Sequence, residues 1–280
     1  MSRPAPLVLD EPNRPEFASW HSYRDFSRQV RSVSRFVWKH DVQAFLDTVL
    51  ATLKDRDVKI QSGRTLFRAQ QGIDSAPVVD EDGEQIGVEE HGYGGARMTP
   101  LRNRAREGRA NPAGIPVLYL ASTEQTAISE VRPWVGSEIS VAQFKIIRDI
   151  RIVNLSPGHG HNTSDHVTLE QFIGDEVVSP KKKEKAVWID IDNAFSKPVT
   201  LSDDRADYVP TQILAELFRN HGYDGIIYRS QFGEKGYNVA LFSLKDAKPI
   251  NCAPYHVTSV EVKFEEVGNR WFSSKDESKR

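Results

Sequence analysis

Cysteine is almost missing from this sequence, since Cys252 is the only one among 280 residues. A single cysteine cannot form a disulfide within the chain, and it excludes a zinc site built from several cysteines. Chains without disulfides are typical of reducing compartments. The near absence of cysteine therefore predicts a cytoplasmic protein.

Long apolar runs are missing as well. No stretch approaches the roughly 18 consecutive apolar residues that are typical of a membrane-spanning helix. At the start of the chain the apolar run Leu7-Val8-Leu9 is too short for the core of a signal peptide. We therefore expect no membrane span, which agrees with a cytoplasmic location.

An excess of charge of either sign is also lacking. Lys and Arg total 37, Asp and Glu total 39, and the net charge is -2. This balance gives no global reason to expect nucleic acid or an anionic membrane as a partner. Small molecules and proteins are the expected partners. At 31.6 kDa the chain has room for one large domain or for one domain with an appendage.

The N-terminal region is predicted to be helical after an extended start. Four prolines fall within residues 1–16. From about 23 to 55 there is no Pro or Gly, and apolar residues recur at helical spacing, which predicts one or two amphipathic helices with a bend near His40. Their basic stripe consists of Arg24, Arg28, Arg31, Arg35 and Lys39. We interpret this stripe as a solvated face, with docking of an acidic partner as the alternative.

The rest of the chain mixes strands and helices without a regular βαβ rhythm, which predicts an α+β fold. Ser122 and Gln125 form a capping-box pattern at the start of a helix. Residues 72–114 are rich in Gly and charge, so we expect a long loop with little regular structure there. Strands are predicted at 65–69, 116–120, 138–147, 149–155, 225–228, 238–242 and 260–264, and helices at 122–132, 169–177, 184–195 and from Pro210 to Gly222.

Three polar residues border these apolar elements without an obvious packing purpose. Arg68 lies inside the strand 65–69, Glu130 lies between the apolar and polar faces of the helix 122–132, and Ser230 follows the strand 225–228. Taken singly, each has a structural alternative, namely an ion pair, a rim salt bridge and a turn residue. Only their combination suggests a site.

Other motifs are weak. Gly92-Tyr93-Gly94-Gly95 is glycine-rich. A phosphate-binding loop normally follows a strand, and no strand is predicted before this segment. His159, His161 and His166 share one polar loop and form a candidate metal site. Unordered loop histidines are more common, so we predict no metal.

Taken together, these segments resemble the RES-domain family, which is named for its Arg, Glu and Ser. The resemblance runs from about Leu66 to Phe242. It is carried by 66–69, by the block Gly108-Arg109-Ala110-Asn111-Pro112, by the helix that contains Glu130, and by 208–212, 222–230 and 238–242. Two departures, Ala110 in place of a bulky residue and a long insert before Gly108, affect the expected mouth of the pocket.

The resemblance implies an ADP-ribosyltransferase-like fold with a split β-sheet core, flanking helices and an N-terminal helical extension. We expect the extension at 1–60, the RES catalytic domain at 61–250, and a C-terminal strand with a flexible tail at 251–280. Members of the family consume NAD⁺ by phosphorolysis or hydrolysis, and several are toxins held by a helix-turn-helix antitoxin. An antitoxin is therefore an expected partner, and the amphipathic N-terminal helices allow a homodimer.

The resemblance also gives roles to particular residues. Glu130 stabilises the positive charge that develops on the ribose as nicotinamide leaves, with Arg68 and Ser230 as its catalytic companions. Arginine matches phosphate groups with its planar fork, so Arg68 and Arg109 are candidates to hold the pyrophosphate. Ser230 is expected to donate a hydrogen bond rather than act as a nucleophile, because no histidine accompanies it in a recognisable pattern.

The remaining predicted binding residues are aromatic or amide side chains. Tyr119 and Tyr93 are candidates to stack on nicotinamide or adenine, and Asn111 to orient Glu130 or the substrate amide. NAD⁺ would be a substrate, so no bound cofactor is expected, and inorganic phosphate is a candidate co-substrate. The alternatives are a mono-ADP-ribosyltransferase that modifies a protein and a catalytically silent nucleotide-binding or interaction module.

Overall fold

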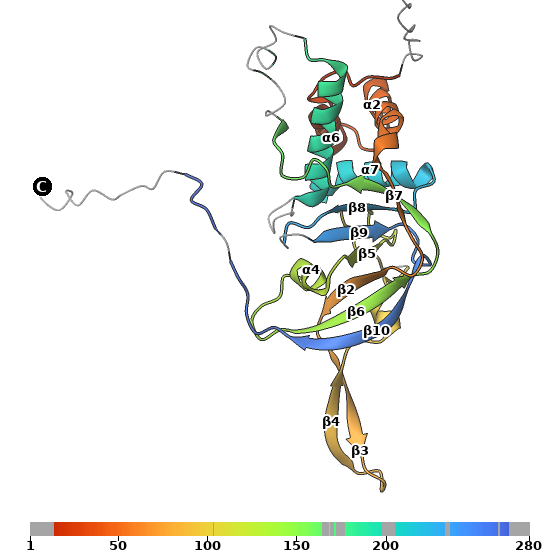
Figure 1. The fold of residues 1–280 in the computed structure, drawn as a ribbon, viewed down its shortest axis with the longest axis vertical. Coiled ribbons are helices and arrows are strands. Elements are labelled where there is room, and N and C mark those ends of the chain that lie inside the picture. The colour runs from red at the N-terminus through yellow and green to blue at the C-terminus, as the bar shows by residue number, and fades with distance from the viewer. Residues whose placement is uncertain are drawn as a thin grey trace, which may run out of the picture.

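The structure is a computed structural model that describes residues 14–102, 104–163, 168, 171, 177–197, 205–232, 236–262 and 264–268. An eight-stranded sheet forms its centre, with a layer of helices at one end and a two-stranded hairpin that projects from the other (Figure 1). The fold is therefore α+β, as the sequence predicts. Within the described part of the chain, no helix has the length and apolar character needed to cross a membrane.

The sheet divides into two halves. Its strand order is β1-β7-β8-β9-β5-β2-β6-β10, and β2 pairs with β5 at one position, Phe67 opposite Ala121. Strands β7 and β8 are parallel, whereas the other neighbours are antiparallel. The split predicted from the family resemblance therefore lies between β5 and β2. The strand bounds are β1 Asp57–Ile60, β2 Thr65–Gln71, β5 Leu118–Ala121, β6 Glu138–Ile146, β7 Ile150–Leu155, β8 Gly225–Arg229, β9 Tyr237–Leu241 and β10 Ala247–His256.

Most of the helices gather on the half that contains β7 and β8 (Figure 1). The chain enters this layer through α1 Ser22–Ser32 and α2 His40–Ala51, so the predicted N-terminal region forms two separate helices. The other members are η1 Leu53–Arg56, α6 Pro180–Ser196, η3 Arg205–Tyr208 and α7 Val209–Asn220. Residues 57–60 at the end of the predicted extension then join the sheet as β1.

Alternation along the strands separates two cores. On β8, Ile226 and Tyr228 pack against the helical layer, whereas Ile227 packs against the second core. That second core lies between the sheet halves and includes Phe144 and Leu241. Because side chains alternate between the faces of a strand, Asn238, which lies opposite Tyr228 in β9, is on the same face of the sheet as Tyr228.

Residues 72–114 contain more regular structure than we predicted. β3 Asp74–Val79 and β4 Gln85–His91 form an antiparallel hairpin, and α3 Gly95–Met98 follows. Gly83, with φ of 83°, supplies the left-handed residue of the turn, and its N–H donates to the carbonyl of Asp80. The hairpin was missed because both of its faces are exposed, so no alternation of buried and polar residues marks it.

The predicted strand at 260–264 is wrong. Strand β10 ends at His256, and Val260, Val262 and Phe264 are exposed and outside any strand. Their alternation does not correspond to burial, because β10 already occupies the edge beside β6. The helix predicted at 169–177 lies almost entirely outside the described residues.

The helix that carries Glu130 begins and ends differently from the prediction. In α4 Glu124–Glu130 the cap is Thr123, whose Oγ1 accepts from the N–H of Thr126, while Ser122 accepts from the N–H of Tyr237 in β9. The helix stops two residues before the predicted end because Arg132, which precedes a proline, has φ of 48°. Glu130 is therefore the last helical residue.

A buried ion pair between η1 and α6 lies where the helical layer meets the sheet. Arg56 Nη1 lies 2.6 Å from Asp192 Oδ1, and the two side chains are 12% and 0% exposed. The Arg56 guanidinium also donates to the carbonyl of Asn154 in β7 and lies over the ring of Trp188. Burial raises the pKa of Asp192 to about 6, against the opposing effect of Arg56. A buried carboxylate of this kind depends on its partner.

We expect Arg56→Ala to lower the free energy of unfolding by about 3–5 kcal/mol, because it leaves the Asp192 charge buried without its cation. Urea denaturation at neutral pH measures the change. The matched control is Arg28→Ala, which removes an exposed ion pair with Asp25 and is expected to cost under about 1 kcal/mol. Equal effects of the two substitutions would contradict this account of the buried pair.

Candidate active site

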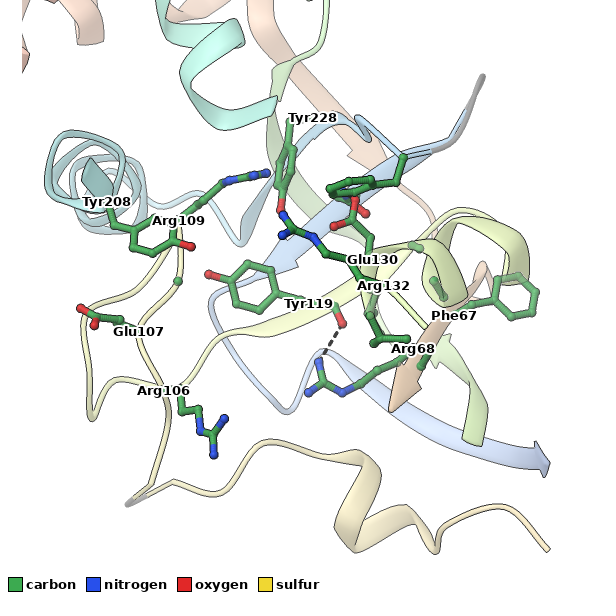
Figure 2. A pocket seen from close by; sticks show the side chains of 18 residues that line it. Phe67, Arg68, Arg106, Glu107, Arg109, Tyr119, Glu130, Arg132, Tyr208 and Tyr228 are labelled. Atoms are coloured by element: carbon green, nitrogen blue, oxygen red, sulfur yellow. Dashed lines mark hydrogen bonds between the residues drawn. The ribbon is translucent and has the colours of Figure 1, made fainter. Parts of the chain in front are cut away.

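A cavity of about 860 Å³ opens where the two halves of the sheet diverge (Figure 2). Its walls come from β2, the loop before β5, β5 itself, α4, η3, β8 and β9. Four arginines line it, namely Arg68, Arg106, Arg109 and Arg132, against the two carboxylates of Glu107 and Glu130. The charge of the lining favours an anionic ligand.

Two donors from the half of the sheet that contains β8 and β9 bind the Glu130 carboxylate. Ser230 Oγ donates to Glu130 Oε1 at 2.7 Å, and Asn238 Nδ2 donates to the same oxygen at 2.5 Å. Ser230 Oγ accepts from the N–H of Phe232 at 3.2 Å, so its own proton is directed to Glu130. Among the described residues, no hydrogen bond to Oε2 is found, and Glu130 lines the cavity.

Strand register brings these donors together. Tyr228 in β8 lies opposite Asn238 in β9, and Ser230 follows two residues after Tyr228 on the same side of the strand. Both donors are buried. Glu130 is separated from them by 100 and 108 residues of sequence. Only the pairing of β8 with β9 and the packing of α4 place all three groups at one point.

Arg68 is a half-buried cation whose side chain makes one hydrogen bond to the described part of the protein. Its Nη1 donates to the carbonyl of Tyr119 at 3.0 Å, next to the position where β2 and β5 stop pairing, and Figure 2 shows this bond. Within the described part of the chain, the buried Nε of Arg68 has no hydrogen-bond partner. Burial lowers the pKa of the guanidinium. An anion placed in the cavity would supply the missing partner.

Arg109 lies near a second aromatic group of the cavity. Its Nη1 donates to the carbonyl of Phe195 at 2.9 Å, and its guanidinium carbon lies 6.0 Å from the centre of the Tyr228 ring. Burial raises the pKa of Tyr228 to about 12, and Arg109 opposes that effect. Arg109, like Arg68, donates one hydrogen bond to a backbone carbonyl, but it also lies near the Tyr228 ring, whereas the buried Nε of Arg68 has no partner.

Asn111 holds the loop before β5 and does not contact Glu130. Its Nδ2 donates to the carbonyls of Arg106, Pro112 and Ile115, and its Oδ1 accepts from the hydroxyl of Tyr119. The role predicted for Asn111, orienting Glu130, is carried out by Asn238 in this structure. Asn111 acts one step away, because it fixes the Tyr119 ring that lines the cavity.

Helix α7 fastens the same loop from the other side. Gln212 Nε2 donates to the carbonyls of Gly108 and Asn111, each at 3.0 Å. Gly108 has no room for a side chain, since an added Cβ would lie 2.6 Å from the Tyr119 hydroxyl. The Gly108-Arg109-Ala110-Asn111 block is therefore a tight turn that brings Arg109 to the cavity.

Tyr93 does not line the cavity. Its hydroxyl donates to the carbonyl of Gln71, and its ring packs in the second core with Leu66 and Met98. The guanidinium of Arg97 covers the ring at 3.5 Å. The stacking role predicted for Tyr93 therefore has no counterpart in this geometry, whereas Tyr119 does lie in the wall of the cavity.

Several residues of the wall were not singled out from the sequence, above all Asn238. A polar residue within the apolar run of β9 was a usable signal, because a buried amide needs partners. Arg132 was marked only by the proline that follows it, and its guanidinium lies 4.8 Å from the centre of the Phe232 ring. Tyr208 and Tyr228, which lie in the segments 208–212 and 225–228, also line the cavity but were given no role from the sequence.

The histidine loop shows no metal geometry in the part that the structure describes. His159 and His161 are described, whereas His166 lies outside the described residues. In the described ranges, no group of three or more His, Cys, Asp or Glu side chains is placed to hold a metal ion. Burial lowers the pKa of His159.

We expect Gly108→Ala to lower the free energy of unfolding by about 1–3 kcal/mol, because the new methyl group overlaps a tyrosine that is held at both ends. Thermal or urea denaturation measures the loss. Gly94→Ala is the matched control, since an added Cβ there meets nothing within 4 Å. A Gly108→Ala protein as stable as the control would mean that the loop yields easily.

Comparisons with known proteins identify a family for this chain. Curated proteins give no match. A solved structure, the crystal structure of the M. tuberculosis MbcT–MbcA toxin–antitoxin complex, is similar at 14% identity and a TM-score of 0.35, over 73% of this chain and 90% of that chain. The RES domain family matches residues 86–264, a range that contains Glu130 and Ser230 but begins after Arg68. Because this match covers more than half of the chain, the protein belongs to the RES-domain family.

Proposed function

We propose that this protein cleaves the bond between nicotinamide and ribose in NAD⁺. The observation that carries the proposal is the Glu130 carboxylate, whose Oε1 is held by Ser230 and Asn238 at the wall of an arginine-lined cavity. Membership of the RES-domain family supports the same reaction. The cavity volume of about 860 Å³ is in the usual range for a small-molecule site.

The chemistry requires one carboxylate. The nicotinamide ring nitrogen is positively charged in NAD⁺ and becomes neutral as the bond breaks, so the leaving group needs no proton. Positive charge develops on the ribose instead, and a fixed carboxylate stabilises it. Ordinary glycosidases need two carboxylates because their leaving oxygen must be protonated. Glu130, held in place by its two donors, fits the single electrostatic role.

The two donors position Glu130 rather than attack the substrate. Ser230 donates its proton to the carboxylate and accepts from a backbone N–H, so its hydrogen bonds hold Glu130 in place, and no histidine accompanies it in a recognisable pattern. Asn238 donates through its amide and has no acidic or basic role. Both keep the carboxylate in one orientation before substrate arrives, which is how preorganised electrostatics lower a barrier.

The pyrophosphate of NAD⁺ is the natural anion for Arg68. A half-buried guanidinium whose buried Nε has no partner gains a strong charge-assisted hydrogen bond from a phosphate oxygen. Arg109 and Arg106 lie in the same wall and extend the anionic subsite. Tyr119 and Phe232 offer aromatic surfaces for the two bases.

The acceptor that captures the ribosyl group is water or inorganic phosphate. Hydrolysis yields ADP-ribose, phosphorolysis yields its 1″-phosphate, and capture by a protein side chain would instead label that protein. Mass analysis of products after incubation with NAD⁺, with and without phosphate, tells these outcomes apart. A toxin role with an antitoxin partner is what the family resemblance implies, and it concerns physiology rather than this chemistry.

Replacing Glu130 with Gln should lower kcat by about 10²–10³-fold, because the charge that stabilises the transition state is lost while the shape is kept. Nicotinamide release measures the rate, and thermal unfolding checks the fold. Glu216→Gln, an exposed carboxylate on α7, is the matched control and should leave the rate unchanged. Unaltered turnover in Glu130→Gln, or no nicotinamide release by the unmodified protein, would refute the proposal.

Arg68→Ala should raise the KM for NAD⁺ by about tenfold to a hundredfold, because it removes a charge-assisted hydrogen bond to phosphate. Arg109→Ala should raise it less, because the Arg109 guanidinium also lies near the Tyr228 ring, whereas the buried Nε of Arg68 has no partner. Steady-state kinetics on both variants give the comparison. A larger effect of Arg109→Ala would assign the pyrophosphate to Arg109 instead.

A further inference from the structure

The β3–β4 hairpin is an acidic arm that projects from the body of the molecule. It stands at the end opposite the helical layer in Figure 1, and its two strands pair only with each other. No Lys or Arg occurs between Arg68 and Arg97. Over the same stretch the hairpin carries seven carboxylates, Asp74, Asp80, Glu81, Asp82, Glu84, Glu89 and Glu90.

One side of this arm is also apolar. Pro77 lies opposite Val88 in the register, and Val79 and Ile86 follow on the same strands beside the bulge that precedes the turn. Ile86 is 66% exposed and Val88 is 60% exposed. An isolated two-stranded ribbon is only marginally stable, and exposed β-branched residues on it mark an interaction surface.

A second exposed surface has the opposite charge. The segment 33–39 connects α1 to α2, and within it Phe36 is 88% exposed and Val37 is 80% exposed. Local hydrogen bonds shape the segment, from Ser34 Oγ to the carbonyl of Val37 and from Trp38 Nε1 to the carbonyl of Arg35. These apolar side chains are thus presented to solvent on an ordered turn.

Basic side chains surround the connecting segment 33–39. Between Asp25 and Asp41 the chain contains no carboxylate, whereas Arg28, Arg31, Arg35 and Lys39 fall in that interval. Arg28 forms an ion pair with Asp25, and Arg31 forms one with Asp207. In the described residues, no carboxylate is paired with Arg35 or Lys39, and both side chains are exposed.

From this complementarity we propose that the acidic hairpin of one molecule docks onto the connecting segment 33–39 of a second copy of the same chain. Each surface joins an exposed apolar group to a charge of one sign, and the signs are opposite. The hairpin and the helical layer lie at opposite ends of the molecule, so one copy cannot bring its own two surfaces together (Figure 1).

The contact is therefore head-to-tail. Such a heterologous interface forms a ring where the rotation closes and an open chain where it does not. Neither surface includes a residue of the cavity wall, so the inference is independent of the proposed NAD⁺ chemistry. An acidic arm also repels nucleic acid and anionic membranes, which leaves a basic protein surface as its partner. The same chain supplies that surface at equal concentration.

Charge reversal tests the interface. The hairpin variant carries Glu81→Lys and Glu84→Lys, and the segment variant carries Arg35→Glu and Lys39→Glu. Sedimentation equilibrium of the full chain over a wide range of concentration, at low and high salt, measures association. Each variant alone should associate about tenfold more weakly or worse, because like charges then face one another. High salt should also weaken the self-association of the unmodified protein, because it screens the attraction between the two surfaces.

An equimolar mixture of the two variants gives the decisive result. The reversed hairpin then faces the reversed segment, and both unreversed surfaces also match, so association should return. Lys59→Glu with Lys145→Glu changes the net charge away from both surfaces and should have no effect. Phe36→Ser and Ile86→Ser should each weaken association without unfolding, since both side chains are exposed.

Three results would overturn the proposal. The unmodified protein could be monomeric at every concentration, or its association could be insensitive to either charge reversal. The third is failure of the mixture to associate, with each variant folded by circular dichroism, which would show that these two surfaces do not bind each other.

Discussion

The hydrogen bonds from Ser230 and Asn238 to Glu130 are the interaction on which the site depends. Helix α4 packs mainly on β2, in one half of the sheet, whereas both donors come from β8 and β9 in the other. A half-buried carboxylate without donors would be costly, so the three groups hold each other in place. These two hydrogen bonds therefore connect the two halves of the sheet and also orient the carboxylate charge.

The split itself creates the space that this charge serves. Where β2 and β5 stop pairing, Arg68 bonds the backbone of β5 through its side chain and leaves Nε unpartnered. The loop before β5 closes the opposite wall, held by Asn111 within the loop and by Gln212 from α7. A continuous sheet would have satisfied its own backbone and left no room for a ligand.

Function and proposed assembly use separate parts of the chain. The cavity lies between the sheet halves, the acidic hairpin projects from one end, and the connecting segment 33–39 belongs to the helical layer at the other. The hairpin falls within the long insert between Arg68 and Gly108. The hairpin contributes no residue to the cavity wall and adds an exposed surface, whereas Arg106 and Glu107 at the end of the same insert line the cavity.

Local patterns in the sequence determined the α+β class, the helical N-terminal region, the strands at Arg68 and before Ser230, and the helix that carries Glu130, because periodicity depends only on neighbouring residues. The candidate trio became a site only when these segments were taken together as a resemblance to the RES-domain family. Only the tertiary structure decided that Asn238 binds Glu130, that Asn111 holds a loop, and that Tyr93 is a core residue. These depend on strand register and on which faces meet across the fold, and residues a hundred positions apart carry no local signal of either.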